Sequence, residues 1–399
     1  MNIIRLINIL RGAIPKNYLN LRNYFLNLFI LKLSTVKKTQ DKKVILIRPD
    51  GIGDFVQWLP CAYAVKDYFK QQGFTLTLLG SSAWIDFAKE LNIFDFHIGL
   101  NRETFLNSTD YRKKIIDELN KYSYEKVIHF APSREFSLGD TIVKSLEAKE
   151  KIGIKGEHSN DSSFWFSISD NWYTKLISIK GLDIYEPEIN EFFLKQLSIP
   201  TPQSNIPSIK LNYKKEFTVT EEDYFIVIPG SNMNIKQWNF ENFAKIIKLV
   251  LNNSSLKCMI CGGNKELQLL EKNKDKIDFE YINMVAKTSL LELTELISKS
   301  KFVLTNDTGA VHFAAGVNKN AYCIYGGGHF GRFLPYKEEK NSERILPNVI
   351  YNKMDCFNCN WKCRYQITKT KPAKCVEGVN VEQVWNHIEK DLPSFKTAH

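Results

Sequence analysis

The sequence predicts an α/β protein with two parallel, doubly wound sheets. Short, mainly apolar runs recur along the chain and are apolar on both faces, which is typical of strands that helices cover on both sides. Segments with helical periodicity separate these runs. Residues 198–220 contain three prolines and little periodicity, so we interpret them as a linker that divides the runs into two series.

The first series predicts an N-terminal domain at residues 43–205, with strands at residues 44–47, 75–79 and 126–130. After the first strand the chain reads Pro49-Asp50-Gly51-Ile52-Gly53-Asp54 and then becomes helical. Ligands in such sheets bind beyond the carboxyl ends of the strands. This glycine-containing turn is therefore a candidate binding site.

The second series predicts a C-terminal domain at residues 206–378, followed by a helical segment at residues 379–399. Its strands are expected at residues 225–228, 258–261, 302–304 and 321–325, and its helices at residues 240–251 and 290–298. Binding sites occur preferentially where domains meet. We therefore expect the active site in a cleft between the two domains.

The most informative stretch follows the strand at residues 302–304. Asp307 and Thr308 are residue types that cap a helix, and a small-residue helical pattern starts at Gly309. A helix N-terminus attracts anions through its positive pole and its unpaired N–H groups. His312 lies one turn into this helix, on the side that could face the same anion. The competing interpretation is an ordinary capped strand–turn–helix unit.

The composition fits a globular protein with two domains, since the 399 residues are 44% hydrophobic and 25% charged. The net charge of +10 is unevenly distributed, because residues 1–43 hold nine Lys and Arg against Asp41 alone. The rest of the chain is close to neutral. We therefore expect no nucleic acid among the partners.

Residues 1–42 read as a basic leader with two apolar runs. The second run is interrupted by Asn27 and Lys32 and is too short to span a bilayer. No small-residue cleavage site follows an uninterrupted apolar core, which argues against a secretory signal. We expect a basic amphipathic helix on an anionic membrane surface. The alternative is a helix packed on the protein's own flank.

Three motifs follow one another along the chain. They are residues 47–56 with Pro60 after them, the stretch from Pro229-Gly230-Ser231 to Lys236-Gln237-Trp238, and residues 306–315 with residues 332–336 after them. In this order and spacing they resemble glycosyltransferase family 9, the bacterial lipopolysaccharide heptosyltransferases. The resemblance covers residues 43–390.

This resemblance implies a GT-B fold, in which two Rossmann-like domains face each other across a cleft. It implies an inverting transfer of heptose or a related sugar from a nucleotide-diphosphate sugar, such as ADP-heptose, to a lipopolysaccharide core or another lipid-linked or oligosaccharide acceptor. No Asp-x-Asp metal motif occurs, so we expect no cofactor in catalysis. The expected location is the cytoplasm, peripherally at the inner face of the bacterial inner membrane.

The same resemblance assigns residues to the reaction. Asp54 matches the family's catalytic aspartate and is the expected general base for the acceptor hydroxyl, with Asp50 as its rival and helix capping as the alternative role. Lys236 matches the lysine that stabilises the departing diphosphate. The other expected donor-binding residues are Gly53, Ser231, Asn232, Gly262, Gly263, Glu266, Asp307, Thr308, Gly309 and His312.

Four cysteines cluster in a loop-rich segment at residues 356–375, namely Cys356, Cys359, Cys363 and Cys375. Four thiolates can hold a structural zinc ion tetrahedrally, so a zinc site is one prediction. Reduced thiols, or disulfides formed on oxidation, are the alternatives.

Two further functions stay open. One is a sugar-nucleotide epimerase or hydrolase on the same fold, which needs no acceptor. The other is a non-catalytic nucleotide-sugar-binding protein of glycan assembly, and the retained Asp54 and Lys236 argue against it.

Overall fold

The computed structural model describes residues 16–33, 42–156, 159–210, 217–339, 343–365 and 371–395. The chain divides into two compact units. Unit 1 comprises Met1–Asp50, Val65–Leu182 and Phe192–Pro200, and unit 2 comprises Gly51–Ala64, Asp183–Glu191 and Thr201–His399. Helices α3 (Ile52–Gln71) and α9 (Glu186–Gln196) contribute residues to both units.

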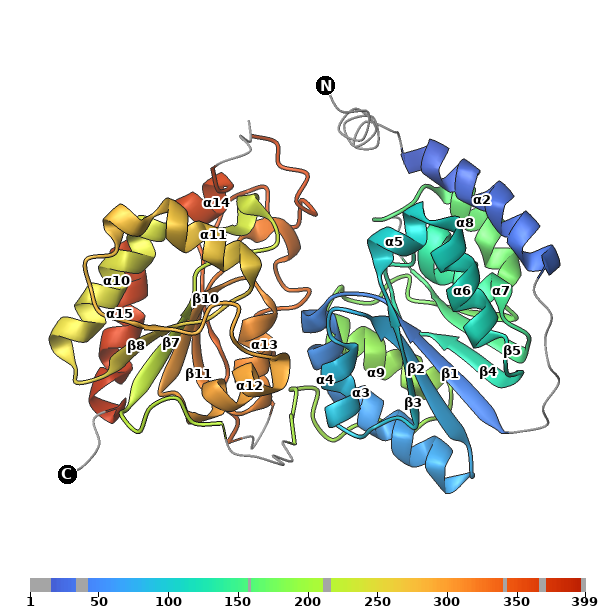
Figure 1. The fold of residues 1–399 in the computed structure, drawn as a ribbon, viewed down its shortest axis with the longest axis horizontal. Helices are drawn as coiled ribbons and strands as arrows, with labels where there is room; N and C mark the ends of the chain where they lie inside the picture. Colours follow the sequence, from blue (N-terminus) through green and yellow to red (C-terminus); the bar gives the residue numbers. More distant parts are fainter. Residues whose placement is uncertain are drawn as a thin grey trace. The chain divides into compact units, whose positions relative to one another are not determined.

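Unit 1 contains a six-stranded parallel sheet with the order β3-β2-β1-β4-β5-β6. Its strands are β1 (Lys43–Arg48), β2 (Thr75–Ser81), β3 (Phe96–Leu100), β4 (Tyr124–His129), β5 (Ala148–Lys155) and β6 (Lys175–Ser178). Helices cover both faces of the sheet (Figure 1). They include α2 (Lys16–Leu33), α4 (Ile85–Glu90), α5 (Arg102–Asn107), α6 (Thr109–Leu119), α7 (Thr141–Ser145) and α8 (Ser163–Ser169).

Unit 2 repeats this architecture with the strand order β12-β11-β10-β7-β8-β9, again with parallel pairing throughout. Its strands are β7 (Tyr224–Ile228), β8 (Lys257–Ile260), β9 (Ile282–Asn283), β10 (Phe302–Asn306), β11 (Asn320–Ile324) and β12 (Asn348–Ile350). Its helices include α10 (Phe240–Asn253), α11 (Asn264–Lys272), α12 (Leu290–Lys299), α13 (Gly309–Gly316), α14 (Lys374–Glu377) and α15 (Val381–Asp391).

The apolar runs form the interior of each sheet. Strands β1 and β7 are buried along their whole length, because helices exclude water from both faces of a doubly wound sheet. The two Rossmann-like folds predicted from the sequence are thereby confirmed. In unit 2 the chain direction across the sheet reverses between β7 and β10, and ligands bind at such a switch point.

The bounds of the two units differ from the predicted domain bounds. The prediction assigns residues 43–205 to one domain, whereas Gly51–Ala64 and Asp183–Glu191 group with unit 2. Gly51 and the first turns of α3 therefore belong with β7 and β10. This grouping places most of the first predicted motif in the same unit as the second and third motifs.

The predicted leader helix is present as α2, and it packs on unit 1 through its polar side. Asn20 and Asn23 are fully buried. Asn20 donates to Asp161 Oδ1 at 2.7 Å and accepts from Ser137 Oγ at 2.6 Å. The described part of the leader thus lies on the flank of the protein, which is the alternative interpretation of the sequence. Residues 1–15 and 34–41 lie outside the described residues.

Within the ranges given above, no helix is both long enough and apolar enough to cross a bilayer.

Replacing Asn20 by Leu tests the packing of α2. The change removes two buried hydrogen bonds and leaves Asp161 and Ser137 without this partner. We expect the free energy of unfolding to fall by about 1–3 kcal/mol, measured by urea denaturation. The control Tyr18→Ser alters an exposed side chain on the same helix and is expected to change it by less than about 0.5 kcal/mol. Equal stability of both variants would contradict this packing.

Candidate active site

The candidate site lies in unit 2, at the carboxyl ends of β7 and β10. The segment after β7 runs from Pro229 to Trp238, and the segment after β10 leads through Asp307 and Thr308 into α13. Both segments leave the sheet at its switch point. The second and third predicted motifs are therefore neighbours in space.

Asn306 ties these two segments together. Its side chain is fully buried at the end of β10. The Nδ2 group donates to Pro229 O at 2.8 Å and to Gly230 O at 3.1 Å. Its Oδ1 accepts from Trp238 N at 2.9 Å. Because this buried amide donates through its nitrogen and accepts through its oxygen, it holds the loop after β7 in one conformation.

Lys236 and Asp307 form an ion pair within this arrangement. Lys236 Nζ donates to Asp307 Oδ2 at 2.8 Å, and the two side chains are only 16% and 9% exposed. Lys236 Nζ also lies 4.8 Å from the ring centroid of Trp361, which is a cation–π distance. An ammonium group has three N–H donors, so its bond to Asp307 leaves donors for phosphate oxygens.

Thr308 is the N-cap of α13. Its hydroxyl accepts from Ala310 N at 3.4 Å and lies 3.1 Å from the hydroxyl of Thr305. The capping role that the sequence assigns jointly to Asp307 and Thr308 is thus taken by Thr308. Asp307 is left to pair with Lys236.

The first turn of α3 meets the first turn of α13 at two glycines. A Cβ atom on Gly53 would lie 3.0 Å from His312 Cδ2, and one on Gly309 would lie 2.8 Å from Ile52 Cγ2. Neither position accommodates a side chain without movement of its neighbour. Two helix N-termini consequently lie against each other, and both carry partial positive charge.

His312 is held neutral at this junction. It is 5% exposed, and its Nδ1 lies 2.7 Å from the hydroxyl of Tyr336. Burial lowers the pKa of His312 from 6.5 to about 4, with Lys236 adding to the decrease and Asp307 opposing it. These electrostatic effects also place His312 near the Lys236–Asp307 pair.

Asp54, the predicted base, follows Gly53 in the first turn of α3. Its Oδ2 accepts from Gly51 N at 3.0 Å, so the alternative capping role is present. Its rival Asp50 belongs to unit 1, where its Oδ2 lies 3.2 Å from Nε of the buried Arg48. Asp54 therefore shares a unit with Lys236 and His312, whereas Asp50 does not.

The other predicted donor residues surround Gly230 and the start of α11. Glu266 Oε2 accepts from Gly263 N at 2.7 Å, which caps this helix. A Cβ atom on Gly230 would lie 2.1 Å from Glu266 Oε1. Gly262 has φ +143°, a conformation that favours glycine. Glu266 is thus packed into the loop, with one carboxylate oxygen committed to the helix.

Ser231 is buried and accepts from Met233 N at 3.4 Å, while Asn232 is exposed. Ser231 also lines a cavity of about 710 Å³ between α10 and α11, together with Lys265 and Lys272. Neither Asp307 nor His312 lines this cavity. The predicted donor residues thus fall into two neighbouring groups, which Asn306 connects through Gly230.

The cysteine-rich segment packs on the glycine run at residues 326–328. Asn358 N donates to Gly327 O at 2.7 Å, and Asn360 N donates to Gly328 O at 2.9 Å. A Cβ atom on Gly328 would lie 2.3 Å from Trp361 Cε2. Because glycines 326–328 have no side chains, the cysteine-rich segment packs closely on them, and this packing places Trp361 beside Lys236.

Cys375 is the buried member of the four cysteines. Gly327 N donates to Cys375 Sγ at 3.4 Å. Burial raises the pKa of Cys375, the hydrogen bond from Gly327 opposes this rise, and electrostatic interaction with Cys356, Cys359 and Cys363 adds to it. Among the residues that the structure describes, no group of three or more His, Cys, Asp or Glu is drawn close enough to hold a metal ion. The predicted zinc site stays a prediction.

Three residues of the site are not among those predicted from the sequence, namely Asn306, Tyr336 and Trp361. Asn306 and Tyr336 belong to the predicted motifs, so their position in the sequence is a signal, although their partners are not. Trp361 carries no signal beyond its place between two cysteines.

The pH dependence of stability tests the environment of His312. Because the pKa of His312 is lowered, between pH 6.5 and about 4 this side chain is protonated in the unfolded chain but neutral in the folded chain. Stability from neutral His312 is therefore present above pH 6.5 and lost as the pH falls toward 4. The stability difference between the wild type and His312→Gln should shrink by up to about 3 kcal/mol over this range. A difference independent of pH in urea denaturation would contradict the buried neutral state.

Comparisons with known proteins agree with this architecture. The family model for glycosyltransferase family 9 (heptosyltransferase) matches residues 112–362. A lipopolysaccharide core heptosyltransferase, OpsX, of Haemophilus influenzae is 20% identical over 88% of this chain and 96% of its own length.

Two solved structures share the fold. Escherichia coli heptosyltransferase WaaC with ADP-2-deoxy-2-fluoro heptose has a TM-score of 0.61 and 17% identity, over 88% of this chain and 99% of its own. The iron-containing dodecameric glycosyltransferase TibC of enterotoxigenic E. coli has a TM-score of 0.53 and 15% identity, over 90% and 78%. The fold is GT-B. Because the family model covers more than half of the chain, this protein belongs to glycosyltransferase family 9 and is a glycosyltransferase.

Proposed function

We propose that the protein transfers heptose or a related sugar, with inversion, from a nucleotide-diphosphate sugar to a lipopolysaccharide core or another surface-glycan acceptor. The donor would be ADP-heptose, and the reaction would take place at the cytoplasmic face of the bacterial inner membrane. Family membership supports the reaction type, and the names of the relatives support the sugar and the acceptor. The observation that carries the proposal is the junction of α3 and α13 beside Lys236.

The junction suits a diphosphate. Two helix N-termini offer backbone N–H groups and partial positive charge, and the glycines let these two N-termini approach each other closely. Neutral His312 adds no charge of its own near neutral pH. The phosphates would therefore be bound mainly by backbone donors and by the ammonium of Lys236.

Lys236 would act on the leaving group. Negative charge grows on the diphosphate as the glycosidic bond breaks, and a fixed cation stabilises that charge most in a partly buried site. Asp307 holds the ammonium in place through its 2.8 Å bond. Trp361 covers it from the side of the cysteine-rich segment. Both contacts orient Lys236 before the donor binds.

Asp54 would remove the proton from the acceptor hydroxyl. Transfer with inversion needs a base on the side opposite the departing diphosphate. One of the Asp54 oxygens, Oδ2, accepts from Gly51 N, which fixes the carboxylate at the start of α3. The capping bond thus positions the base rather than replacing its catalytic role.

The variant Asp54→Asn tests this assignment. Loss of a general base is expected to lower kcat by about 10²–10⁴-fold, with KM for the donor nearly unchanged. The assay follows the glycosylated acceptor by mass spectrometry. Asp50→Asn is the matched comparison and is expected to reduce stability, through its contact with Arg48, more than turnover. Near-normal kcat for Asp54→Asn would remove it from this role.

The same assay separates the alternative functions. Donor consumption that is equally fast without acceptor would indicate an epimerase or hydrolase. Binding of the donor without turnover under any condition would indicate a non-catalytic binding protein.

We propose, second, that Cys356, Cys359, Cys363 and Cys375 hold a structural metal ion. Four thiolates suit tetrahedral zinc or iron. Zinc is the metal predicted from the four cysteines, and the iron content of the similar-folded TibC favours a second candidate. The ion would fix the segment that carries Trp361, and catalysis would use no step through it.

Metal analysis of protein purified without chelator tests this site. We expect stoichiometric zinc or iron in the wild type and its loss in Cys359→Ser, because three thiolates bind more weakly than four. Trp361→Leu is the matched control and should keep the metal while lowering kcat through a less restrained Lys236. Metal-free wild type with full activity would contradict the proposal.

A further inference from the structure

Helix α2 has its polarity reversed with respect to an ordinary surface helix. The side that faces unit 1 carries Asn20, Asn23 and Asn27, which are 0%, 0% and 5% exposed. The outward side carries Tyr18, Leu21 and Phe25, which are 57%, 46% and 60% exposed. An amphipathic helix on a water-soluble surface normally does the opposite. The apolar side of α2 is thus left facing outward.

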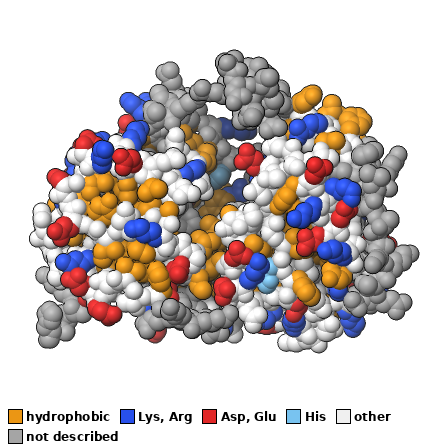
Figure 2. All heavy atoms as spheres, viewed as in Figure 1, with side chains coloured by type: hydrophobic (Ala, Val, Ile, Leu, Met, Phe, Trp, Pro, Cys, Tyr) orange, Lys and Arg blue, Asp and Glu red, His pale blue; other side chains and the backbone are white. Residues whose placement is uncertain are grey.

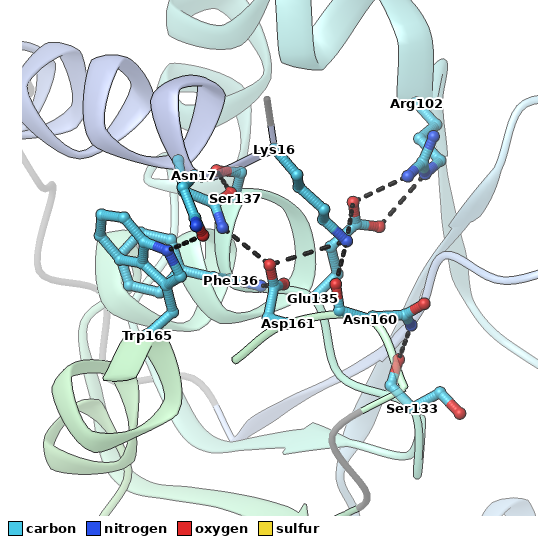
Figure 3. Close-up of polar contacts among 11 residues, drawn as sticks. Lys16, Asn17, Arg102, Ser133, Glu135, Phe136, Ser137, Asn160, Asp161 and Trp165 are labelled. Carbon is cyan, nitrogen blue, oxygen red and sulfur yellow. Dashed lines mark hydrogen bonds and ion pairs between the residues drawn. The ribbon is translucent and has the colours of Figure 1, made fainter. Parts of the chain in front are cut away.

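Specific hydrogen bonds prevent α2 from rolling over to bury these side chains. Besides the bonds of Asn20, Asn27 donates to Thr141 Oγ1 and accepts from Arg112 Nη1, both at 3.0 Å. Asn17 Oδ1 accepts from Trp165 Nε1 at 3.0 Å (Figure 3). A rotated helix would leave several buried polar groups unpaired, at a cost above the gain from three apolar side chains.

The apolar surface extends beyond α2. Phe164 on α8 is 64% exposed, and its ring lies 5.1 Å from that of Trp165, the residue that contacts Asn17. Figure 2 shows hydrophobic side chains at the surface over α2. Scattered apolar residues are normal on a protein surface, whereas a group on one helix face indicates an interaction site.

The sequence on either side of α2 favours an anionic partner. On the helix itself Lys16 pairs with Glu135 and Asp161, and Arg22 donates to Leu106 O, so these two cations are bonded to unit 1. The flanking sequence, residues 1–15 and 34–43, adds Arg5, Arg11, Lys37, Lys38, Lys42 and Lys43 against Asp41 alone. Basic residues are attracted to anionic lipid headgroups, while Tyr, Leu and Phe enter the boundary between headgroups and acyl chains.

We propose that α2 docks this outward side, Tyr18, Leu21 and Phe25, on the surface of an anionic phospholipid bilayer. Its polar side remains bound to unit 1, so the helix lies in the plane of the interface. A second copy of the chain fits less well, because a symmetric dimer would bring two strongly basic segments together. The proposal does not rest on the sugar-transfer reaction.

The test is vesicle flotation of the full chain, which needs no activity. Vesicles of phosphatidylglycerol mixed with phosphatidylcholine are compared with vesicles of phosphatidylcholine alone. We expect the wild type to float with the anionic vesicles and to dissociate as salt is raised. The triple variant Tyr18→Ser, Leu21→Ser, Phe25→Ser should bind them at least about tenfold more weakly.

The matched control replaces three exposed apolar residues elsewhere, Phe96→Ser, Leu182→Ser and Ile345→Ser. It should bind vesicles like the wild type. If the triple variant loses its cooperative melting transition, the single variant Phe25→Ser takes its place with a smaller expected loss.

Three results would overturn the proposal. They are equal flotation of the triple variant and the wild type, equal binding of the wild type to both kinds of vesicle, and a lipid-free dimer of the wild type that the triple variant dissociates. The last result would assign the surface to a second copy of the chain.

Discussion

The candidate site depends on a close approach of two helix starts that leaves no room for side chains. Gly53 and Gly309 lie where a Cβ atom would be 3.0 Å from His312 and 2.8 Å from Ile52. The absence of side chains at these two positions allows the N-termini of α3 and α13 to lie together, so their partial positive charges add. The full charge of Lys236 lies beside them. The sequence places glycine at both points because any side chain would separate the helices.

Neutral and charged polar groups hold this geometry before any substrate binds. Asn306 fixes the loop after β7 through its side-chain amide, Asp307 fixes Lys236, and Tyr336 contacts His312. A site whose dipoles are already oriented needs little reorganisation when charge develops. The buried asparagines of α2 likewise form hydrogen bonds to unit 1, and these bonds fix the orientation of the helix on that unit.

The parts of the fold that the sequence predicts are those with local signals. Strand β7 is apolar throughout, β1 has four consecutive apolar residues between Lys43 and Arg48, and glycine-containing turns follow both strands. Strand β5, which reads AKEKIGIK, escapes prediction because its charged residues interrupt the pattern. The bonds of Asn306 join residues 76 and 77 positions apart. No local pattern encodes such contacts, nor the reversed polarity of α2.

The proposed site requires that the α3–α13 junction bind a diphosphate, and calorimetric titration of ADP measures this binding. Gly309→Val should push the two helix starts apart and weaken ADP binding at least about tenfold, through lost charge-assisted hydrogen bonds. Gly181→Ala in unit 1, where φ is +86°, strains the backbone and controls for stability alone. Unchanged ADP affinity in a folded Gly309→Val protein would contradict the account.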